Sequence, residues 1–288
     1  MSYVLILIII AAFSGGSAPV FGKLALAAFQ PFTAMTIRFF FASIVLLPFI
    51  KKEALSLDSF GKNWKTALVG AMNPLLFFIA LPFIQTSVTP LIYGLVPLFT
   101  ATYNRVVCKK TLQRKQIIGL AIGFIGVSII VLLPLLEKNP TIADLKGNAA
   151  IVIAAIAFTA YAFMSKNQQE THDMSAITLT FHFCIMSLFI SIPLAAYELA
   201  HKPLQIGTIG MLPLFSGVYI GIVGTAIFYL TFQQALRLSS ELTASLFTYL
   251  QPFSTISLAI LLLSEHITFP FILGGALSVL GATLVSRK

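Results

Sequence analysis

The sequence predicts an all-α integral membrane protein whose ten transmembrane helices form two inverted five-helix repeats. Hydrophobic residues occupy 58% of its 288 positions and charged residues only 9%, so most of its surface is expected to face lipid. Residues 86–131 and 241–286 align without a gap at an offset of 155. The connection within the first block is rich in lysine and arginine, and the matching connection in the second block has neither. Because short cationic loops stay cytoplasmic, the two copies are expected to have opposite orientations.

Ten apolar runs, each about long enough to cross a bilayer, are separated by polar residues. The connection at 85–87 is short enough for the third and fourth runs to form one long span, but four prolines from Pro74 to Pro97 favour kinks and a break. No linker or soluble appendage is visible, which predicts one membrane domain over 1–288 with repeats at about 1–140 and 145–288. The runs cover approximately 3–26, 31–50, 65–84, 87–107, 115–136, 147–165, 175–197, 208–232, 240–263 and 268–286.

The repeat is clearest where both copies carry a proline or a glycine at the same place. Pro97 aligns with Pro252 in the fourth helix of each half. In the third helices, Gly70 aligns with Gly221 at an offset of 151 instead of 155. This difference predicts that the first copy lacks four residues, about one helical turn, near the junction of its third and fourth helices.

Lysine and arginine predict how the chain is oriented in the membrane. With the N-terminus inside, thirteen of these residues fall in cytoplasmic segments, and four, namely Lys23, Lys138, Lys146 and Lys202, fall outside. Both termini are therefore expected in the cytoplasm. The net charge of +9 does not indicate nucleic-acid binding, because its cations lie in short connections and no soluble basic domain exists to hold them.

Arg38 is the most informative single residue, because it lies about seven residues into an apolar helix. A guanidinium at this depth costs several kcal/mol unless it is paired, reaches the interface or faces water. It could therefore line a central cavity and hold an anionic group such as a carboxylate, or extend to the outer interface. Its counterpart in the second repeat is His182. This histidine could bind a substrate or carry a proton, or it could only pack between helices.

Amides, phenols and prolines at similar depths predict a polar, aromatic pocket. Tyr93 precedes Pro97, and Tyr249 and Gln251 precede Pro252. A proline frees a backbone carbonyl one turn back, which can face a cavity, although proline can also only bend the helix. Each polar side chain is explained equally well by an interhelical hydrogen bond. The candidate substrate-binding residues are Arg38, Asn73, Tyr93, Tyr161, His182, Tyr229, Gln233, Tyr249 and Gln251.

Small residues predict one flexible segment and one closely packed helix pair. The stretch from Ser14 to Pro19 is expected to break the first helix and expose backbone to the cavity. The candidate gating residues are Gly15, Gly16, Pro19, Pro97 and Pro252. The glycines of the fifth and tenth helices have small-xxx-small spacing and are expected to pack helices closely. They are Gly119, Gly123, Gly126, Gly274 and Gly281.

Motifs for catalysis and metal binding are absent from the sequence. It contains no His-Glu-x-x-His, no Gly-x-Ser-x-Gly and no Walker glycine loop, and its carboxylates lie at helix ends or in loops. Cys108 and Cys184 fall on different elements and are expected to be reduced thiols. We therefore expect no enzymatic activity, no cofactor, no metal and no buried carboxylate relay for protons.

The chain resembles the drug/metabolite transporter superfamily, and within it the EamA-type permeases, along its whole length. The resemblance is best from Thr86-Ser87 through Pro97-Leu98-Phe99 to Gly126-Val127, and in the second copy at Pro252-Phe253 and Ser264-Glu265-His266. It implies alternating access and a central cavity built mainly from helices one, three, four, six, eight and nine. The chain departs from the pattern of this family in two places. Helix one has Phe13-Ser14-Gly15 where the family often has a Trp-Gly-Ser-like stretch, and helix four ends in Cys108-Lys109-Lys110 where the family often has a Gly-Glu-like end.

The first functional hypothesis is a permease of a bacterial cytoplasmic (inner) membrane that moves amino acids or similar small metabolites, with Arg38 favouring a carboxylate. The alternatives are a carrier of nucleotide conjugates or S-adenosylmethionine-like molecules and an exporter of lipophilic drugs. From other classes, a membrane enzyme or a non-transporting scaffold remains open. The expected partners are a small-molecule substrate and the lipid bilayer, with the chain as a monomer or a weak homodimer.

Overall fold

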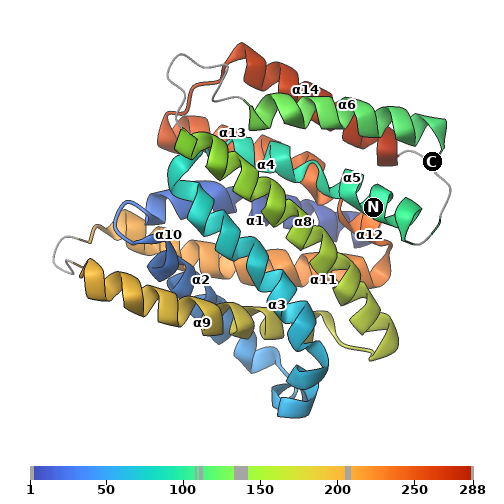
Figure 1. Cartoon of the computed structure of the whole chain (residues 1–288). Coiled ribbons are helices and arrows are strands. Elements are labelled where there is room, and N and C mark those ends of the chain that lie inside the picture. The colour runs from blue at the N-terminus through green and yellow to red at the C-terminus, as the bar shows by residue number, and fades with distance from the viewer. Residues whose placement is uncertain (1–2, 108, 110–112, 133–141, 205–208, 287–288) are drawn as a thin grey trace.

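A bundle of long helices makes up the computed structural model, which describes residues 3–107, 109, 113–132, 142–204 and 209–286. All regular secondary structure in these ranges is helical, and the two ends of the chain lie on the same side of the bundle (Figure 1). The helices are α1 Tyr3–Ala25, α2 Pro31–Leu46, α3 Leu57–Ala80, α4 Val88–Tyr93, α5 Val96–Val106, α6 Arg114–Val131, α8 Ile142–Thr171, α9 Ala176–His201, α10 Met211–Gly221, α11 Phe228–Leu238, α12 Glu241–Ala244, α13 Phe247–Leu263 and α14 Phe269–Ser286. A π-helical turn at Ile222–Ile227 joins α10 to α11.

The helices are those of a multi-pass membrane protein, as the composition predicts. Among the described residues, seven helical segments are long and apolar enough to cross a bilayer. Large apolar side chains such as Phe124, Phe189 and Leu261 are more than two-thirds exposed on the outside of the bundle. A water-soluble fold would bury such side chains, whereas a bilayer solvates them.

Several helices extend beyond the predicted spans. The third begins at Leu57 instead of 65, where the Ser56 side chain accepts a hydrogen bond from the Ser59 backbone nitrogen. The sixth covers 142–171 instead of 147–165. The spans were predicted from apolar residues, whereas a helix ends where its cap lies, so polar turns continue past the membrane. The end of the fifth predicted span at 133–136 lies outside the described residues, as do Cys108 and Lys138.

The two halves of the chain interlock through matching helix contacts. From the first half, α1 packs against α10, α11 and α13 of the second half. From the second half, α8 packs against α3, α4 and α5 of the first half. The α2 helix packs against α9, and α6 packs against α14 at the upper edge of the bundle in Figure 1. The main contacts of α1 with helices of the second half thus resemble those of α8 with helices of the first half.

Glycines lie where α6 and α14 approach each other. A Cβ atom added to Gly126 would lie 2.7 Å from the carbonyl oxygen of Gly274, and one added to Gly281 would lie 2.6 Å from that of Gly119. Gly123 also contacts α5, because its Cβ would lie 2.5 Å from Cδ2 of Leu98. These separations leave no room for a side chain, so the backbones of the two helices pack directly on each other.

The junction between the third and fourth helices corrects one prediction about the repeat. The helical residues before the junction end at Phe83 in the first half and at Leu238 in the second. These positions are 155 apart, which is the offset of the aligned blocks that follow. The prediction of four missing residues is therefore wrong. Apolar helices share residue types easily, and the match of Gly70 with Gly221 at another offset carried no structural equivalence.

Candidate functional site

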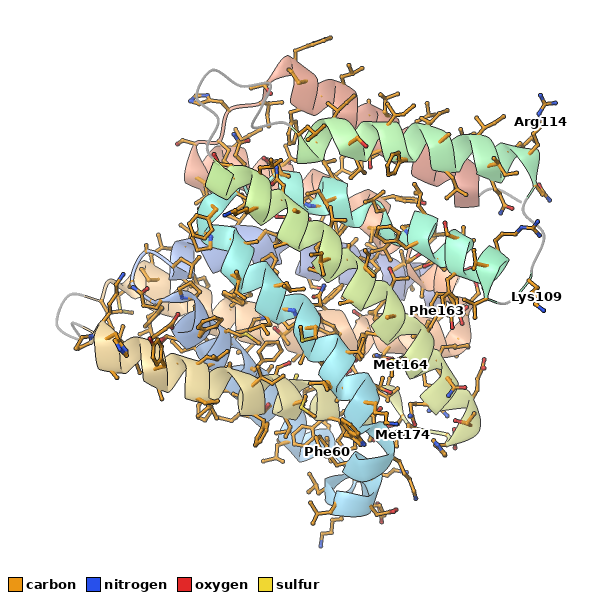
Figure 2. The ribbon with its side chains drawn as sticks, viewed as in Figure 1. Phe60, Lys109, Arg114, Phe163, Met164 and Met174 are labelled. Carbon is orange, nitrogen blue, oxygen red and sulfur yellow. The ribbon has the colours of Figure 1, made fainter. Side chains whose placement is uncertain are left out.

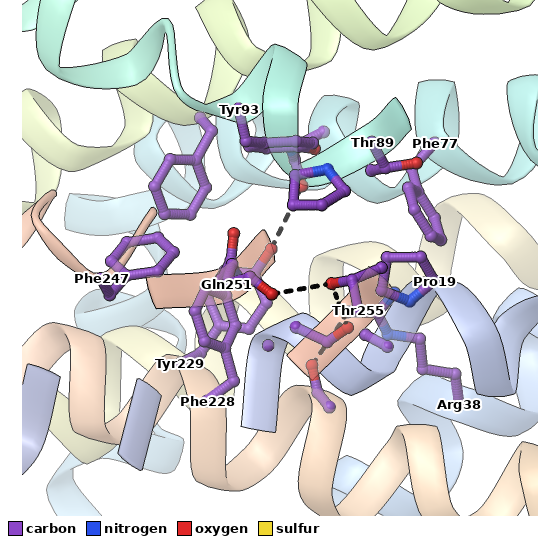
Figure 3. A pocket seen from close by; sticks show the side chains of 17 residues that line it. Pro19, Arg38, Phe77, Thr89, Tyr93, Phe228, Tyr229, Phe247, Gln251 and Thr255 are labelled. Carbon is purple, nitrogen blue, oxygen red and sulfur yellow. Dashed lines mark hydrogen bonds between the residues drawn. The ribbon is translucent and has the colours of Figure 1, made fainter. Parts of the chain in front are cut away.

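A cavity of about 50 Å³ lies at the centre of the bundle, where α1, α2, α3, α4, α8, α11, α13 and the π-helical turn meet (Figure 3). Five of the nine predicted substrate-binding residues line it, namely Arg38, Asn73, Tyr93, Tyr229 and Gln251. The helices that form it include all six that the family resemblance implies. The second helix, which the resemblance does not include, also contributes to the cavity through Arg38.

Arg38 is buried, with 5% of its side chain exposed, and it lies inside the protein instead of reaching the interface. Its Nε donates to Oγ1 of Thr225 at 2.6 Å, and its Nη2 donates to the carbonyl oxygen of Gly224 at 3.3 Å. The guanidinium also lies 5.2 Å from the ring centre of Phe39 and 5.8 Å from that of Phe78. No carboxylate among the described residues pairs with it.

The π-helical turn explains how this arginine is held. A π-helix bonds each residue to the fifth one along the chain, which widens the turn and displaces its carbonyls from the usual pattern. Gly224 and Thr225 lie in this turn and receive the guanidinium. A guanidinium has five N–H donors, and these two contacts use two of them. The remaining donors lie on the Nη atoms, at a residue that lines the cavity.

Asn73 joins two tyrosines across the cavity. Its Nδ2 donates to the hydroxyl of Tyr93 at 2.5 Å and to the carbonyl oxygen of Ala154 at 2.9 Å. The hydroxyl of Tyr229 donates to its Oδ1 at 3.3 Å. One amide thereby holds side chains or backbone of four helices, α3, α4, α8 and α11. Tyr93 uses its oxygen as an acceptor in this contact, so its hydroxyl proton is free to bond a ligand.

The first helix contacts α13 through its glycines. The hydroxyl of Thr255 donates to the carbonyl oxygen of Gly16 at 2.5 Å, and a Cβ on Gly15 would lie 2.6 Å from Nε2 of Gln251. The predicted break in the first helix is wrong, because α1 is continuous from Tyr3 to Ala25 with Pro19 inside it. The glycines instead let the two helices approach closely, and they do line the cavity as expected.

Several lining residues were not among the predicted site residues. Phe158, Phe228 and Phe247 form an aromatic wall, with Phe158 and Phe247 5.9 Å apart between ring centres, and Phe77 lines the cavity apart from them (Figure 3). Thr89 also lines the cavity and is 2% exposed, and its hydroxyl has no hydrogen-bond partner among the described residues. In Figure 3, Arg38 and Phe77 lie toward one side and Phe228, Tyr229 and Phe247 toward the other, so the arginine faces a mainly aromatic wall across the cavity.

Four predicted substrate-binding residues lie away from this cavity. Tyr161 and Gln233 belong to a buried network in which Nε2 of Gln233 donates to the Tyr161 hydroxyl at 2.8 Å. His182 contacts the carbonyl oxygen of Ala54 at 2.7 Å and ties α9 to the turn before α3. Tyr249 is partly buried and packs against the hydrophobic core.

The predicted gating prolines of the fourth and ninth helices also lie away from the cavity. Pro97 lies in the first turn of α5, after the break at Gly94 and Leu95 that separates α5 from α4, and Pro252 lies within α13. Neither lines the cavity. Among the described residues, no cluster of three or more His, Cys, Asp or Glu side chains could hold a metal.

A multi-pass helical bundle with a polar and aromatic cavity at its centre is the architecture of a membrane transporter. The model of the EamA-like transporter family matches the chain twice, over residues 2–132 and 145–287, and the chain belongs to that family. It is similar to an uncharacterized transporter of Archaeoglobus fulgidus, at 25% identity over 72% of this chain and 70% of that protein. The uncharacterized transporter YyaM of Bacillus subtilis is 24% identical over 90% of this chain and 85% of its own.

The overall fold also has a counterpart among solved structures. One crystal structure covers 95% of this chain and is itself covered to 94%, with a TM-score of 0.62. Its sequence is 18% identical to this one, so the likeness concerns the fold alone. The family match and the likeness in fold each extend over nearly the whole chain.

Proposed function

We propose that the chain is a secondary transporter that moves amino acids or similar small metabolites across a bacterial cytoplasmic membrane by alternating access. The observation that carries this proposal is Arg38, a buried guanidinium on the cavity wall whose two hydrogen-bond partners are neutral. A buried charge without a counter-ion is costly, and an anionic ligand offsets that cost. A carboxylate suits it because two oxygens match the planar fork of a guanidinium.

The opposite wall indicates what the rest of the substrate resembles. Phe158, Phe228 and Phe247 offer apolar surface to a hydrocarbon or aromatic group. Gln251 has an amide on the cavity wall that could accept a bond from an ammonium group, and Tyr93 has a free hydroxyl proton. A molecule with a charged head and an apolar tail, such as an apolar amino acid, satisfies both ends. A lipophilic drug would use the aromatic wall and leave Arg38 unpaired.

Ten transmembrane helices in two inverted repeats are the architecture we propose for this transport. Both the double match of the family model and the reciprocal packing of the two halves support it. Lys109 and Arg114 flank the connection between α5 and α6, on the right of Figure 2, and both chain ends lie on that side in Figure 1. That side is cytoplasmic in our proposal, since short cationic connections are retained there.

The size of the cavity supports a cycle in which the site opens to one side at a time. Its volume of about 50 Å³ is well below the roughly 300 Å³ of ordinary ligand sites. A metabolite therefore enters only when helices around the cavity move apart. Inverted repeats provide two equivalent ways to do so, one at each face. The proposed assembly is a monomer or a weak homodimer.

Flux measurements in proteoliposomes test the proposal. Purified protein is reconstituted and assayed with labelled amino acids, nucleotide conjugates including S-adenosylmethionine, and lipophilic cations. We expect saturable flux for at least one apolar amino acid and competition by its unlabelled form. Saturable flux restricted to nucleotide conjugates or to lipophilic cations would refute the proposed cargo. No saturable flux for any member of the panel would refute transport itself and favour a scaffold or an enzyme.

A further inference from the structure

A lysine at the end of α1 holds the end of α3. The Nζ of Lys23 donates to the carbonyl oxygens of Leu81 at 2.8 Å, Pro82 at 3.2 Å and Ile84 at 2.9 Å. These three carbonyls lie where the helix has run out of backbone partners, and a cation is favourable there. An ammonium group has three donors, so this single side chain closes the C-terminal end of α3 against α1.

An equivalent lysine holds the equivalent helix of the second half. The Nζ of Lys166, on α8, donates to the carbonyl oxygens of Leu236 and Ser239, each at 3.1 Å, and of Arg237 at 3.5 Å. Leu236 and Ser239 are 155 positions after Leu81 and Ile84, the offset of the repeat. The first and sixth helices thus hold the third and eighth helices through lysine-to-carbonyl hydrogen bonds, and Lys166 also pairs with Glu170 on its own helix at 3.5 Å.

Each lysine lies beyond the central cavity, toward one end of the bundle. Pro19 and Phe77 line the cavity, and Lys23 and its partner Leu81 each lie four residues, about one helical turn, further along. A hollow of about 430 Å³ lies beside Lys23 and is also lined by Pro82, Ile84 and Glu265. The Lys23 contacts therefore lie between the cavity and this hollow.

The second lysine lies on the other side of the cavity, between it and the end where the chain termini lie. Phe158 and Tyr229 line the cavity, and Lys166 and its partner Leu236 are seven or eight residues, about two turns, further along the same helices. The two lysine contacts thus lie beyond opposite ends of the cavity. In this conformation both contacts are made.

We propose that Lys23 and Lys166 are the latches of two gates, one at each face of the membrane. The inference rests on the proposed transport function and adds the residues that control its two openings. Opening at the Lys23 face requires α1 and the end of α3 to separate, and water then solvates the ammonium and the three carbonyls. Opening at the Lys166 face requires the same of α8 and α11. Loss of one latch therefore favours opening at its own face.

Thiol labelling from each face tests this inference without any substrate. The background carries Cys108→Ser and Cys184→Ala, and Gln251→Cys places one reporter thiol in the cavity. A membrane-impermeant methanethiosulfonate reagent is applied to right-side-out and to inverted vesicles. We expect Lys23→Met to raise the ratio of labelling rates, Lys23 face over Lys166 face, by on the order of tenfold, the effect of about one charge-assisted hydrogen bond. Lys166→Met is expected to lower that ratio by a similar factor.

The matched control is Lys65→Met, which removes an exposed lysine of α3 and is expected to leave the ratio unchanged. Equal shifts in the same direction for both latch variants, or none beyond the control, would overturn the inference. If a methionine variant fails to reach the membrane, Lys→Gln at the same position must give the same direction of shift. If the protein transports substrate in proteoliposomes but the two lysine variants do not shift the labelling ratio in opposite directions, the latches alone are refuted. If the labelling ratio shifts in opposite directions but no substrate is transported, the transport function is refuted.

Discussion

Replacing Arg38 with methionine separates a role in ligand binding from a role in the fold. Methionine keeps much of the length and apolar contact of the side chain and removes its charge. The variant loses the hydrogen bonds to Thr225 and Gly224. It also loses the buried positive charge, which no carboxylate of the described residues neutralises. These two losses affect stability with opposite sign.

The magnitudes predict a small change in stability and a large change in binding. Two hydrogen bonds to a charged group contribute about 3–6 kcal/mol, and the desolvation of one unpaired ion costs several kcal/mol. The two terms nearly cancel, so the unfolding temperature of the ligand-free variant is expected to stay within about 4 °C of the parent or to rise. A bound carboxylate that loses two charge-assisted bonds loses about 3 kcal/mol, or roughly 150-fold in Kd.

The assay measures both quantities on one preparation. Flux in proteoliposomes gives KM and the maximal rate for a carboxylate-bearing cargo, and thermal unfolding in detergent gives stability. Arg105→Met is the control, because Arg105 is exposed on α5 and is expected to change neither. An Arg38→Met protein with unchanged KM and a much lower unfolding temperature would refute the reasoning. It would show that the arginine serves the fold and not a ligand.

Three further substitutions test the packing, a cap and the cavity. Gly126→Ala places a Cβ 2.7 Å from a carbonyl oxygen of α14 and is expected to cost about 1–3 kcal/mol in thermal unfolding, whereas Gly61→Ala, with nothing within 4 Å, should cost nothing. Glu265→Gln weakens the four hydrogen bonds at the start of α4 and is expected to lower the unfolding temperature by about 3–6 °C. Its control is Glu53→Gln, which changes an exposed carboxylate and is expected to leave the unfolding temperature unchanged. Gly15→Ala pushes a methyl group against the cavity wall and should raise KM for the cargo on the order of tenfold, with an unchanged KM contradicting that placement.

The sequence predicted those cavity residues whose polar or charged side chains are energetically costly within an apolar helix. Arg38 was identifiable because an arginine in an apolar helix is expensive wherever it lies, and a cavity is one of few places that tolerate it. Asn73 and Gln251 stood out for the same reason to a lesser degree. Chemistry alone identified these residues, and the fold then showed that they share one cavity.

The parts that the sequence could not predict are those decided by which face of a helix points inward. Phe158 and Phe247 line the cavity, yet phenylalanine is common in apolar helices and carries no signal of its own. For His182 the error was the reverse, because it was predicted to be a site residue but lies outside the cavity. Its side chain contacts the backbone carbonyl oxygen of Ala54 instead. A one-residue change in helix phase, about 100°, separates the two outcomes. Side-chain direction is set by tertiary packing, which one sequence does not contain.

The asymmetry between the two halves has a local cause at one helix start. Glu265 accepts hydrogen bonds from the backbone nitrogens of residues 86 and 87, and so caps the start of α4. The position equivalent to Glu265 in the first half is Lys110, which could not cap the start of α12 in that way. The start of α12 has its own cap instead, because the side chain of Ser240 accepts from the Thr243 backbone nitrogen at 3.2 Å. The two helix starts are thus capped differently, α4 by a carboxylate from a distant connection and α12 by a serine next to it in the chain.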